Sequence, residues 1–168
     1  AQTEDKQTIL MMAVLEGKLE VVREMFREKA VHATLNYPDG TGATALHYSV
    51  RLKDSRMMKL LLDYKGKPHM RDSMGRNVLS WACQHGGVEF VKVLHKRHVD
   101  IHNSDAEGKT ALFYAILSED EQTALYLLSA GADQNKQDVD GTSPKMLARE
   151  VGCAEVVHSM KVIAGTAI

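Results

Sequence analysis

A short motif recurs along this chain at a constant interval. An aspartate followed three residues later by a glycine begins at Asp39, Asp72, Asp105 and Asp138, so successive copies start 33 residues apart. Asp-x-x-Gly is typical of a turn, because the aspartate side chain can bond the backbone ahead of it and glycine tolerates a positive φ. A fixed period of this length indicates stacked structural repeats, each of which buries its apolar face against its neighbours.

Each copy predicts a pair of helices. A Thr, Asn or Ser follows the turn where a helix would begin, and these residues suit a helix N-cap. A short apolar helix is expected next, for example over 78–84, and then an amphipathic helix, for example over 88–94. Three glycines are expected to break the chain between the two helices of their repeats: Gly17, Gly86 and Gly152.

A fifth copy lies upstream, where 8–13 matches the same frame with an offset of 36 instead of 33. Three extra residues therefore fall near Asn36 to Pro38, in an expected loop. We expect one domain over 1–168, in which the first and last repeats act as caps with a polar outer side. The expected repeats are 5–38, 39–71, 72–104, 105–137 and 138–163.

The segment Thr44-Ala-Leu-His47 resembles the Thr-Pro-Leu-His-x-Ala signature of the ankyrin repeat family. The segments 21–25 and 88–94 resemble its second-helix signature, and the resemblance covers about 5–163. It implies an all-α solenoid of stacked helix-turn-helix repeats with short β-turn or hairpin fingers. The chain departs from the family pattern at several positions, and among them Lys53 and Glu119 stand where a glycine usually separates the helices.

The resemblance also implies a binding surface. In ankyrin arrays the concave side, lined by turn tips and first helices, binds partner proteins. Four of the ten residues placed in the middle of this surface are cationic and none is acidic, with Glu16 and Glu107 beside them as counter-charges. The surface is either merely solvated or a shallow, mildly basic groove. The ten residues are Arg51, Leu52, Arg71, Met74, Arg76, Gln84, His85, Lys109, Leu117 and Ser118.

One column of large residues occupies the same position in every repeat. It could be an exposed ladder that stacks bases or a peptide, or it could fill the seams between repeats. Packing at the seams is favoured, because repeat arrays depend on interfaces between neighbours. The column contains Met12, Tyr48, Trp81, Tyr114 and Leu147.

The spacing of His95 and His98 permits a zinc pair, but no carboxylate or cysteine stands at a partner spacing. We therefore expect ordinary surface histidines and no metal or cofactor. The chain also lacks a nucleophile elbow, a phosphate loop, a dinucleotide fingerprint and a His-Glu-x-x-His motif, so no enzymatic activity is expected.

Composition and net charge limit the kinds of partner and the compartment that we expect for this chain. A net charge of −1 lacks the basic excess of nucleic-acid-binding domains. The longest apolar run, 9–15, is too short to span a bilayer. The only cysteines, Cys83 and Cys153, fall in different repeats beyond disulfide reach, and free thiols fit the cytosol or the nucleus. A monomer is expected in isolation.

The leading hypothesis is a module that binds an acidic or polar peptide, or a folded partner protein. The chain has no initial methionine, so we expect it to be the recognition part of a larger protein. The alternative is a stand-alone inhibitor or regulator of an enzyme such as a kinase, similar in size to the small ankyrin inhibitors of cyclin-dependent kinases. Those have a degraded first helix in repeat two, whereas 44–50 reads as an intact helix here.

Overall fold

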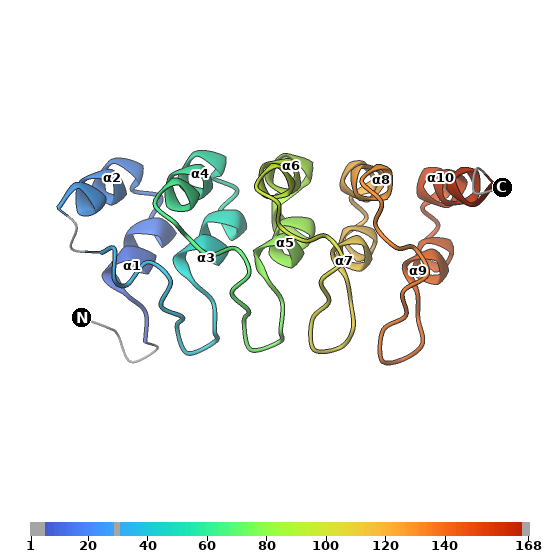
Figure 1. The fold of residues 1–168 in the computed structure, drawn as a ribbon, viewed down its shortest axis with the longest axis horizontal. Coiled ribbons are helices and arrows are strands. Elements are labelled where there is room, and N and C mark those ends of the chain that lie inside the picture. Colours follow the sequence, from blue (N-terminus) through green and yellow to red (C-terminus); the bar gives the residue numbers. More distant parts are fainter. Residues whose placement is uncertain (1–5, 29–30, 166–168) are drawn as a thin grey trace.

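The computed structural model describes residues 6–28 and 31–165, which form five stacked pairs of helices (Figure 1). The first helices of the pairs form one layer and the second helices form another. The first helices are α1 (Ile9–Leu15), α3 (Ala45–Arg51), α5 (Val78–Trp81), α7 (Ala111–Leu117) and α9 (Pro144–Glu150). The second helices are α2 (Leu19–Arg27), α4 (Ser55–Asp63), α6 (Val88–Lys96), α8 (Glu121–Ser129) and α10 (Ala154–Gly165).

This arrangement confirms the all-α solenoid. Loops project as fingers from the layer of first helices (Figure 1). No sheet occurs in the described parts of the chain, and Ser104 and Thr110 form an isolated bridge at the base of one finger. Within 6–28 and 31–165 no helix is both long and apolar enough to cross a lipid bilayer.

The Asp-x-x-Gly turns form as the sequence predicts. Asp72 Oδ1 accepts hydrogen bonds from the backbone N–H of Met74 at 3.0 Å and of Arg76 at 2.9 Å. Equivalent pairs of bonds close the fingers that begin at Asp39, Asp105 and Asp138. Each finger is therefore held by its own leading carboxylate, which satisfies backbone donors that would otherwise lack partners.

Neighbouring fingers are also tied to one another. The N–H of Ser73 donates to the Thr41 carbonyl at 2.7 Å, and the N–H of Ala106 donates to the Met74 carbonyl at 3.1 Å. A third bond joins Val139 to the Glu107 carbonyl at 2.9 Å. The fingers thus form a connected row, in which each tip fixes the position of the next.

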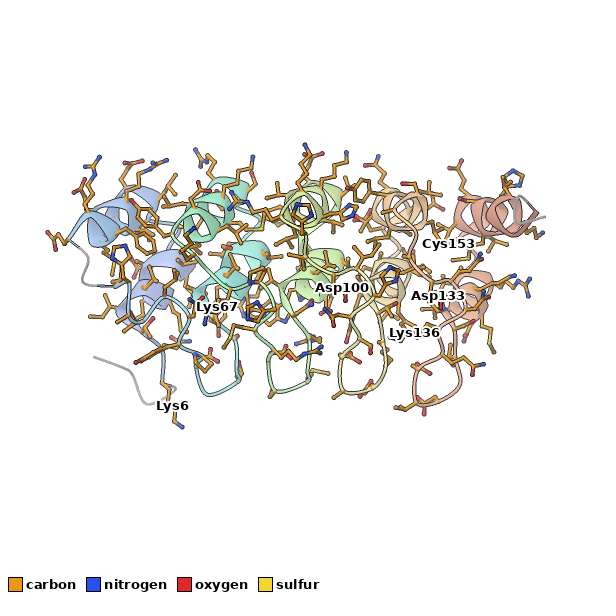
Figure 2. The ribbon with its side chains drawn as sticks, viewed as in Figure 1. Lys6, Lys67, Asp100, Asp133, Lys136 and Cys153 are labelled. Atoms are coloured by element: carbon orange, nitrogen blue, oxygen red, sulfur yellow. The ribbon has the colours of Figure 1, made fainter. Side chains whose placement is uncertain are left out.

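Connecting segments lead from the second helix of one repeat to the finger of the next repeat. Lys136 Nζ donates to the His102 carbonyl at 3.1 Å, which links two successive connections. The Lys67 N–H donates to Asn36 Oδ1 at 2.7 Å, which anchors the loop that holds the three extra residues. Figure 2 shows the equivalent positions of these connections, Lys67, Asp100 and Asp133.

The predicted helix starts are largely confirmed. Asn77 Oδ1 accepts from the Ser80 N–H at 3.0 Å, and Ser143 Oγ accepts from the Met146 N–H at 3.3 Å. Thr8 caps α1 in the same way at 3.2 Å. Thr110 precedes α7 without a side-chain capping bond. Such caps satisfy the free N–H groups of a first turn and fix where each helix begins.

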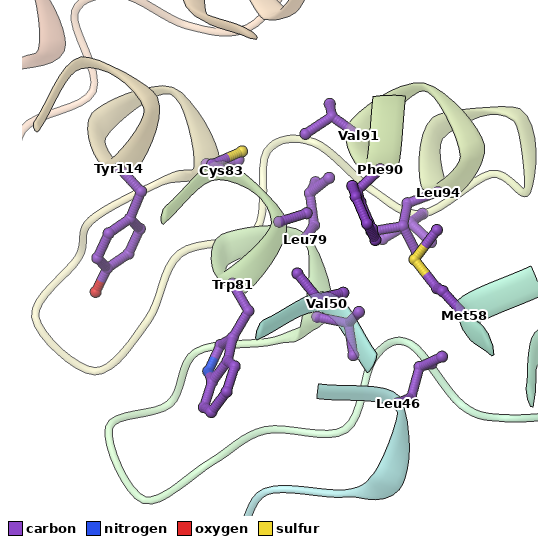
Figure 3. Packing of buried hydrophobic residues seen from close by; sticks show 14 of the residues in the cluster. Leu46, Val50, Met58, Leu79, Trp81, Cys83, Phe90, Val91, Leu94 and Tyr114 are labelled. Carbon is purple, nitrogen blue, oxygen red and sulfur yellow. The ribbon is translucent and has the colours of Figure 1, made fainter. Parts of the chain in front are cut away.

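The core runs through the whole stack. Side chains of α3, α4, α5 and α6 meet in one apolar cluster, in which Val50 lies close to Leu79 and Met58 approaches Leu94 (Figure 3). No repeat buries its apolar side chains alone, which is how a stack of short helices gains stability.

The column of large residues mostly packs at the seams, as expected. Its aromatic members also bond the fingers: Trp81 Nε1 donates to Asp72 Oδ2 at 2.9 Å, and Tyr114 Oη donates to Asp105 Oδ2. Tyr48 bonds Asp39 in the same way, and Leu147 is buried. For Met12 the prediction is wrong, because 42% of the residue is exposed.

Repeat three departs from the predicted turn between its helices. The first helix does not continue to residue 84 as an α-helix but closes in a π-helical turn, η1 (Ala82–Gly86). The positive φ then falls on Gly87, at 90°, instead of on Gly86. The sequence permits this shift because Gly87 stands where Asp54 and Asp120 cap the second helices of repeats two and four, so no capping side chain fixes the turn.

Candidate partner-binding surface

The candidate residues come from two kinds of element. Arg51, Leu52, Leu117 and Ser118 lie at or just after the ends of α3 and α7, and Gln84 and His85 lie in η1. Arg71, Met74, Arg76 and Lys109 lie in or beside the fingers of repeats three and four. They occupy repeats two, three and four, the middle of the stack.

Side-chain contacts bring the two elements together in repeat three. Arg76 Nη1 donates to Gln84 Oε1 at 2.9 Å, so the finger is bonded to the end of its own first helix. The Arg76 guanidinium lies 5.4 Å from the Trp81 ring centre, and the Trp81 and His85 rings are 5.7 Å apart. Ser118 Oγ also donates to the Gln84 carbonyl at 3.4 Å and links repeat three to repeat four.

Three apolar side chains stand open among these polar residues. Leu52 is 39% exposed, Met74 46% and Leu117 50%. They come from three successive repeats: Leu52 and Leu117 lie at the ends of first helices, and Met74 lies in a finger. Exposed leucine and methionine side chains offer contact area, and methionine is enriched in interface cores.

The positive charge of this surface is smaller than the residue count predicts. Arg76 Nη2 lies 2.8 Å from Asp72 Oδ2, with both side chains largely buried, and Lys109 Nζ lies 2.6 Å from Glu107 Oε2. Arg71 donates to two carbonyl oxygens, those of Gly75 at 2.6 Å and Ser104 at 2.7 Å. These three cations stabilise fingers.

Arg51 is different. It is exposed, its guanidinium lies 5.2 Å from the Tyr48 ring centre, and it has no ion pair within the described ranges. Burial lowers the pKa of the neighbouring His85 below its usual value, and three cations lower it further: Arg76, Arg51 and Lys53. Net positive charge therefore remains at Arg51 and Lys53, and also at Arg71, whose bonds to neutral oxygens leave its charge in place.

Lys53 is not among the ten candidate residues predicted from the sequence. It lines a hollow of about 220 Å³ together with Gln84, His85, Gly87 and Ser118. The signal in the sequence was its position, because a lysine replaces the glycine that usually separates the two helices.

The cysteines do not form a reactive site. Both Cys83 and Cys153 are free thiols and both are buried. Burial raises the pKa of both thiols, with a smaller effect of Asp120 on Cys83 and of Glu121 and Glu119 on Cys153. A thiol held in its protonated form is a weak nucleophile and a weak metal ligand.

The histidines of the second helix and following loop of repeat three differ in their surroundings. One ring nitrogen of His95, Nδ1, lies 2.8 Å from the Tyr126 hydroxyl, which joins α6 to α8. His98 and His102 are exposed. Over the residues that the structure describes, no three His, Cys, Asp or Glu side chains are grouped so that they could hold a metal ion.

Stacked helix pairs, a row of bonded fingers and an open surface across the middle repeats define a helical-repeat solenoid, a class that presents extended binding surfaces. The family model for ankyrin repeats (3 copies) matches residues 1–72 and 51–138. This chain therefore belongs to the ankyrin repeat family, whose domains generally mediate protein–protein interactions and are typically non-catalytic.

Curated relatives share this sequence pattern at a distance. Protein glp-1 of Caenorhabditis elegans is 29% identical over an alignment that covers 92% of this chain and 13% of that protein. Human transient receptor potential cation channel subfamily A member 1 is 34% identical over 88% of this chain and 14% of its own length. NF-kappa-B inhibitor alpha of Sus scrofa is 28% identical over 81% of this chain. The chain spans less than half the length of each relative, 46% of the last one.

Proposed function

We propose that this chain is a non-catalytic recognition module that binds an acidic or polar segment of a partner protein across its concave middle repeats. It works as the recognition part of a larger protein, in the cytosol or the nucleus. The observation that carries the proposal is a set of exposed apolar side chains, Leu52, Met74 and Leu117, on the same repeats as Arg51, a cation that has no ion pair among the described residues.

The arrangement suits a peptide or a protein surface better than a small molecule. The hollow beside Lys53 is small and open, and the apolar side chains are spread over three repeats. Contacts of this kind gain affinity from a few central anchors, with charged residues at the rim that set the rate of association and its salt dependence.

The test uses a partner captured from a native lysate by the immobilised chain and then purified. Arg51→Glu with Leu117→Ser is expected to weaken its binding at least tenfold, since an apolar contact is lost and one attraction becomes a repulsion. Raising the salt concentration is expected to weaken binding to the unchanged chain more than binding to the variant.

Lys59→Glu is the matched control, because Lys59 is an exposed cation on the second helix α4. It makes the same change of net charge on the other layer and is expected to leave affinity unchanged. The concave surface would be refuted as the binding site if the control lost as much affinity as Arg51→Glu with Leu117→Ser, or if neither variant lost affinity. Arg76 is left intact, because its bond to Asp72 holds the finger.

The alternative is a stand-alone inhibitor of an enzyme such as a kinase. The small ankyrin inhibitors that it resembles in size have a degraded first helix in repeat two. Here α3 is a regular helix of seven residues, with buried Leu46 and Val50 facing the core. Recognition within a larger protein is therefore the proposal retained.

A further inference from the structure

The turns between paired helices carry opposite charges in repeats two and four. Lys53 and Glu119 occupy the same repeat position and both adopt a left-handed backbone, with φ of 56° and 55°. Repeats one and five place Gly17 and Gly152 there. A left-handed conformation is costly for any residue with a Cβ atom, and such outliers cluster at functional sites.

The positive end lies at repeat two. Lys53 and Arg51 are exposed and neither forms an ion pair within the described chain. The adjacent carboxylate, Asp54, caps α4 by accepting from Arg56 and Met57, and it lies 3.6 Å from the Arg56 side chain. Arg51 and Lys53 are therefore the free charges of this turn.

The negative end lies at repeat four. Asp120 caps α8 through Thr123, while Glu119 and Glu121 are exposed and have no ion pair in the described ranges. No lysine or arginine occurs in α7 or α8. The turn of repeat four therefore carries two negative charges without an ion pair among the described residues, whereas the turn of repeat two carries two positive ones.

One hollow connects the two charged ends, and a second adjoins it at the acidic end. The first, of about 220 Å³, reaches from Lys53 past His85 and Ser118 to Asp120. The second, of about 420 Å³, continues from Asp120 and is lined by Glu119, Glu121, Val151 and Cys153. The two hollows and the turns beside them form one edge of the stack. This edge is continuous with the candidate binding surface, because three residues belong both to that surface and to the first hollow: Gln84, His85 and Ser118.

We infer that the partner segment has two charged ends, and that it lies along this edge with its acidic end over repeat two and its basic end over repeat four. The inference rests on the proposed function and specifies the chemistry of the partner. Neighbouring helices pack about 8–10 Å apart, so the two ends are separated by roughly 16–20 Å. About six residues of extended chain span that distance.

The probe is a fluorescent peptide with an Asp block and a Lys block separated by about six Gly and Ser residues. A nitroxide on its acidic end is expected to broaden the amide resonances of Arg51 and Lys53 in the NMR spectrum of the whole chain. A nitroxide on its basic end is expected to broaden those of Glu119 and Glu121 instead.

Charge exchange supplies the decisive comparison. Arg51→Glu with Lys53→Glu, or Glu119→Lys with Glu121→Lys, is expected to lower the affinity for the probe about tenfold, because each pair of changes turns attraction into repulsion. The variant with all four changes is expected to recover affinity and to bind the probe in the reverse orientation, so that the acidic end now broadens repeat four.

The outcomes separate this inference from the proposed function. If the captured partner still requires Arg51 and Leu117 but an all-Asp peptide binds as well as the two-block probe, the surface binds partners and the inference is wrong. If the variant with all four changes binds the probe in the original orientation, the charges do not orient the segment and the inference is wrong. If the partner is indifferent to Arg51 and Leu117 as well, the proposed function itself is wrong.

Discussion

At the residue scale, the glycines of the finger tips differ in what surrounds them. A Cβ on Gly75 would lie 2.6 Å from the Ala106 nitrogen, because the next finger bonds there, and φ is +78°. Gly75→Ala is therefore expected to lower the free energy of unfolding by about 3 kcal/mol, measured by urea denaturation.

Gly141→Ala is the matched control for that change. Gly141 has nearly the same φ, +79°, but no atom lies within 4 Å of the added Cβ. Only the backbone cost of about 1 kcal/mol is expected. Equal losses at the two glycines would show that contact between fingers does not limit this position.

His47 is expected to make stability depend on pH. Burial lowers its pKa to about 4, and it accepts a hydrogen bond from the Thr44 N–H at 3.1 Å. The unfolded chain, with an ordinary pKa near 6.5, binds a proton first as pH falls. Stability is thus full above about pH 6.5 and is lost between about pH 6.5 and 4, by up to about 3 kcal/mol.

His47→Gln keeps an acceptor for Thr44 but does not titrate. The variant is expected to show a flatter profile of unfolding free energy from about pH 6.5 to 4 than the unchanged chain. The low-pKa carboxylates Asp39 and Asp72 act at lower pH, where they become protonated. Parallel profiles for the two chains in the upper window would contradict a buried, neutral His47.

At the scale of the element, two turns between paired helices place a charged residue in a left-handed backbone conformation that is less costly for glycine. Lys53→Gly and Glu119→Gly are each expected to raise the free energy of unfolding by about 1 kcal/mol, because glycine adopts their left-handed backbone at no steric cost. Thermal and urea denaturation measure the change. Affinity for the two-block probe is expected to fall in the same variants.

Lys59→Gly tests the converse. Lys59 lies inside α4, where glycine is less favourable than residues with a side chain, so a loss of about 1 kcal/mol is expected. A loss of stability at Lys53 or Glu119 as well would mean that those side chains stabilise their turns, and that the charges need no functional explanation.

The sequence predicted the helix pairs and most of the caps, because the Asp-x-x-Gly turns and the Thr, Asn and Ser caps are local signals. The π-helical turn was not predictable in this way. Gly86 and Gly87 are both permissive, and only packing in three dimensions, where a Cβ on Gly86 would lie 2.9 Å from the Phe90 ring, distinguishes them. Sequence reasoning placed the break one residue early for this reason.

For the whole molecule, the register predicted in which repeat each candidate residue lies but not which charges form ion pairs. Arg76 and Lys109 carry full charges in the sequence, yet in the folded stack Arg76 is paired with Asp72 and Lys109 with Glu107. Lys53 and Glu119, noted as departures from the family pattern, are the free charges instead. Departures from the family pattern thus indicated exposed charges that the list of candidate surface residues left out.

The central claim is that the concave middle repeats bind the partner. Hydroxyl-radical footprinting with mass spectrometry tests it directly, because exposed methionines stand both inside and outside this surface: Met74 is 46% exposed and Met146 52%. Binding of the captured partner is expected to protect Met74, Leu52 and Leu117 from oxidation while Met146 stays reactive. Protection of Met146 or of Val21 on α2, with Met74 unchanged, would contradict the account.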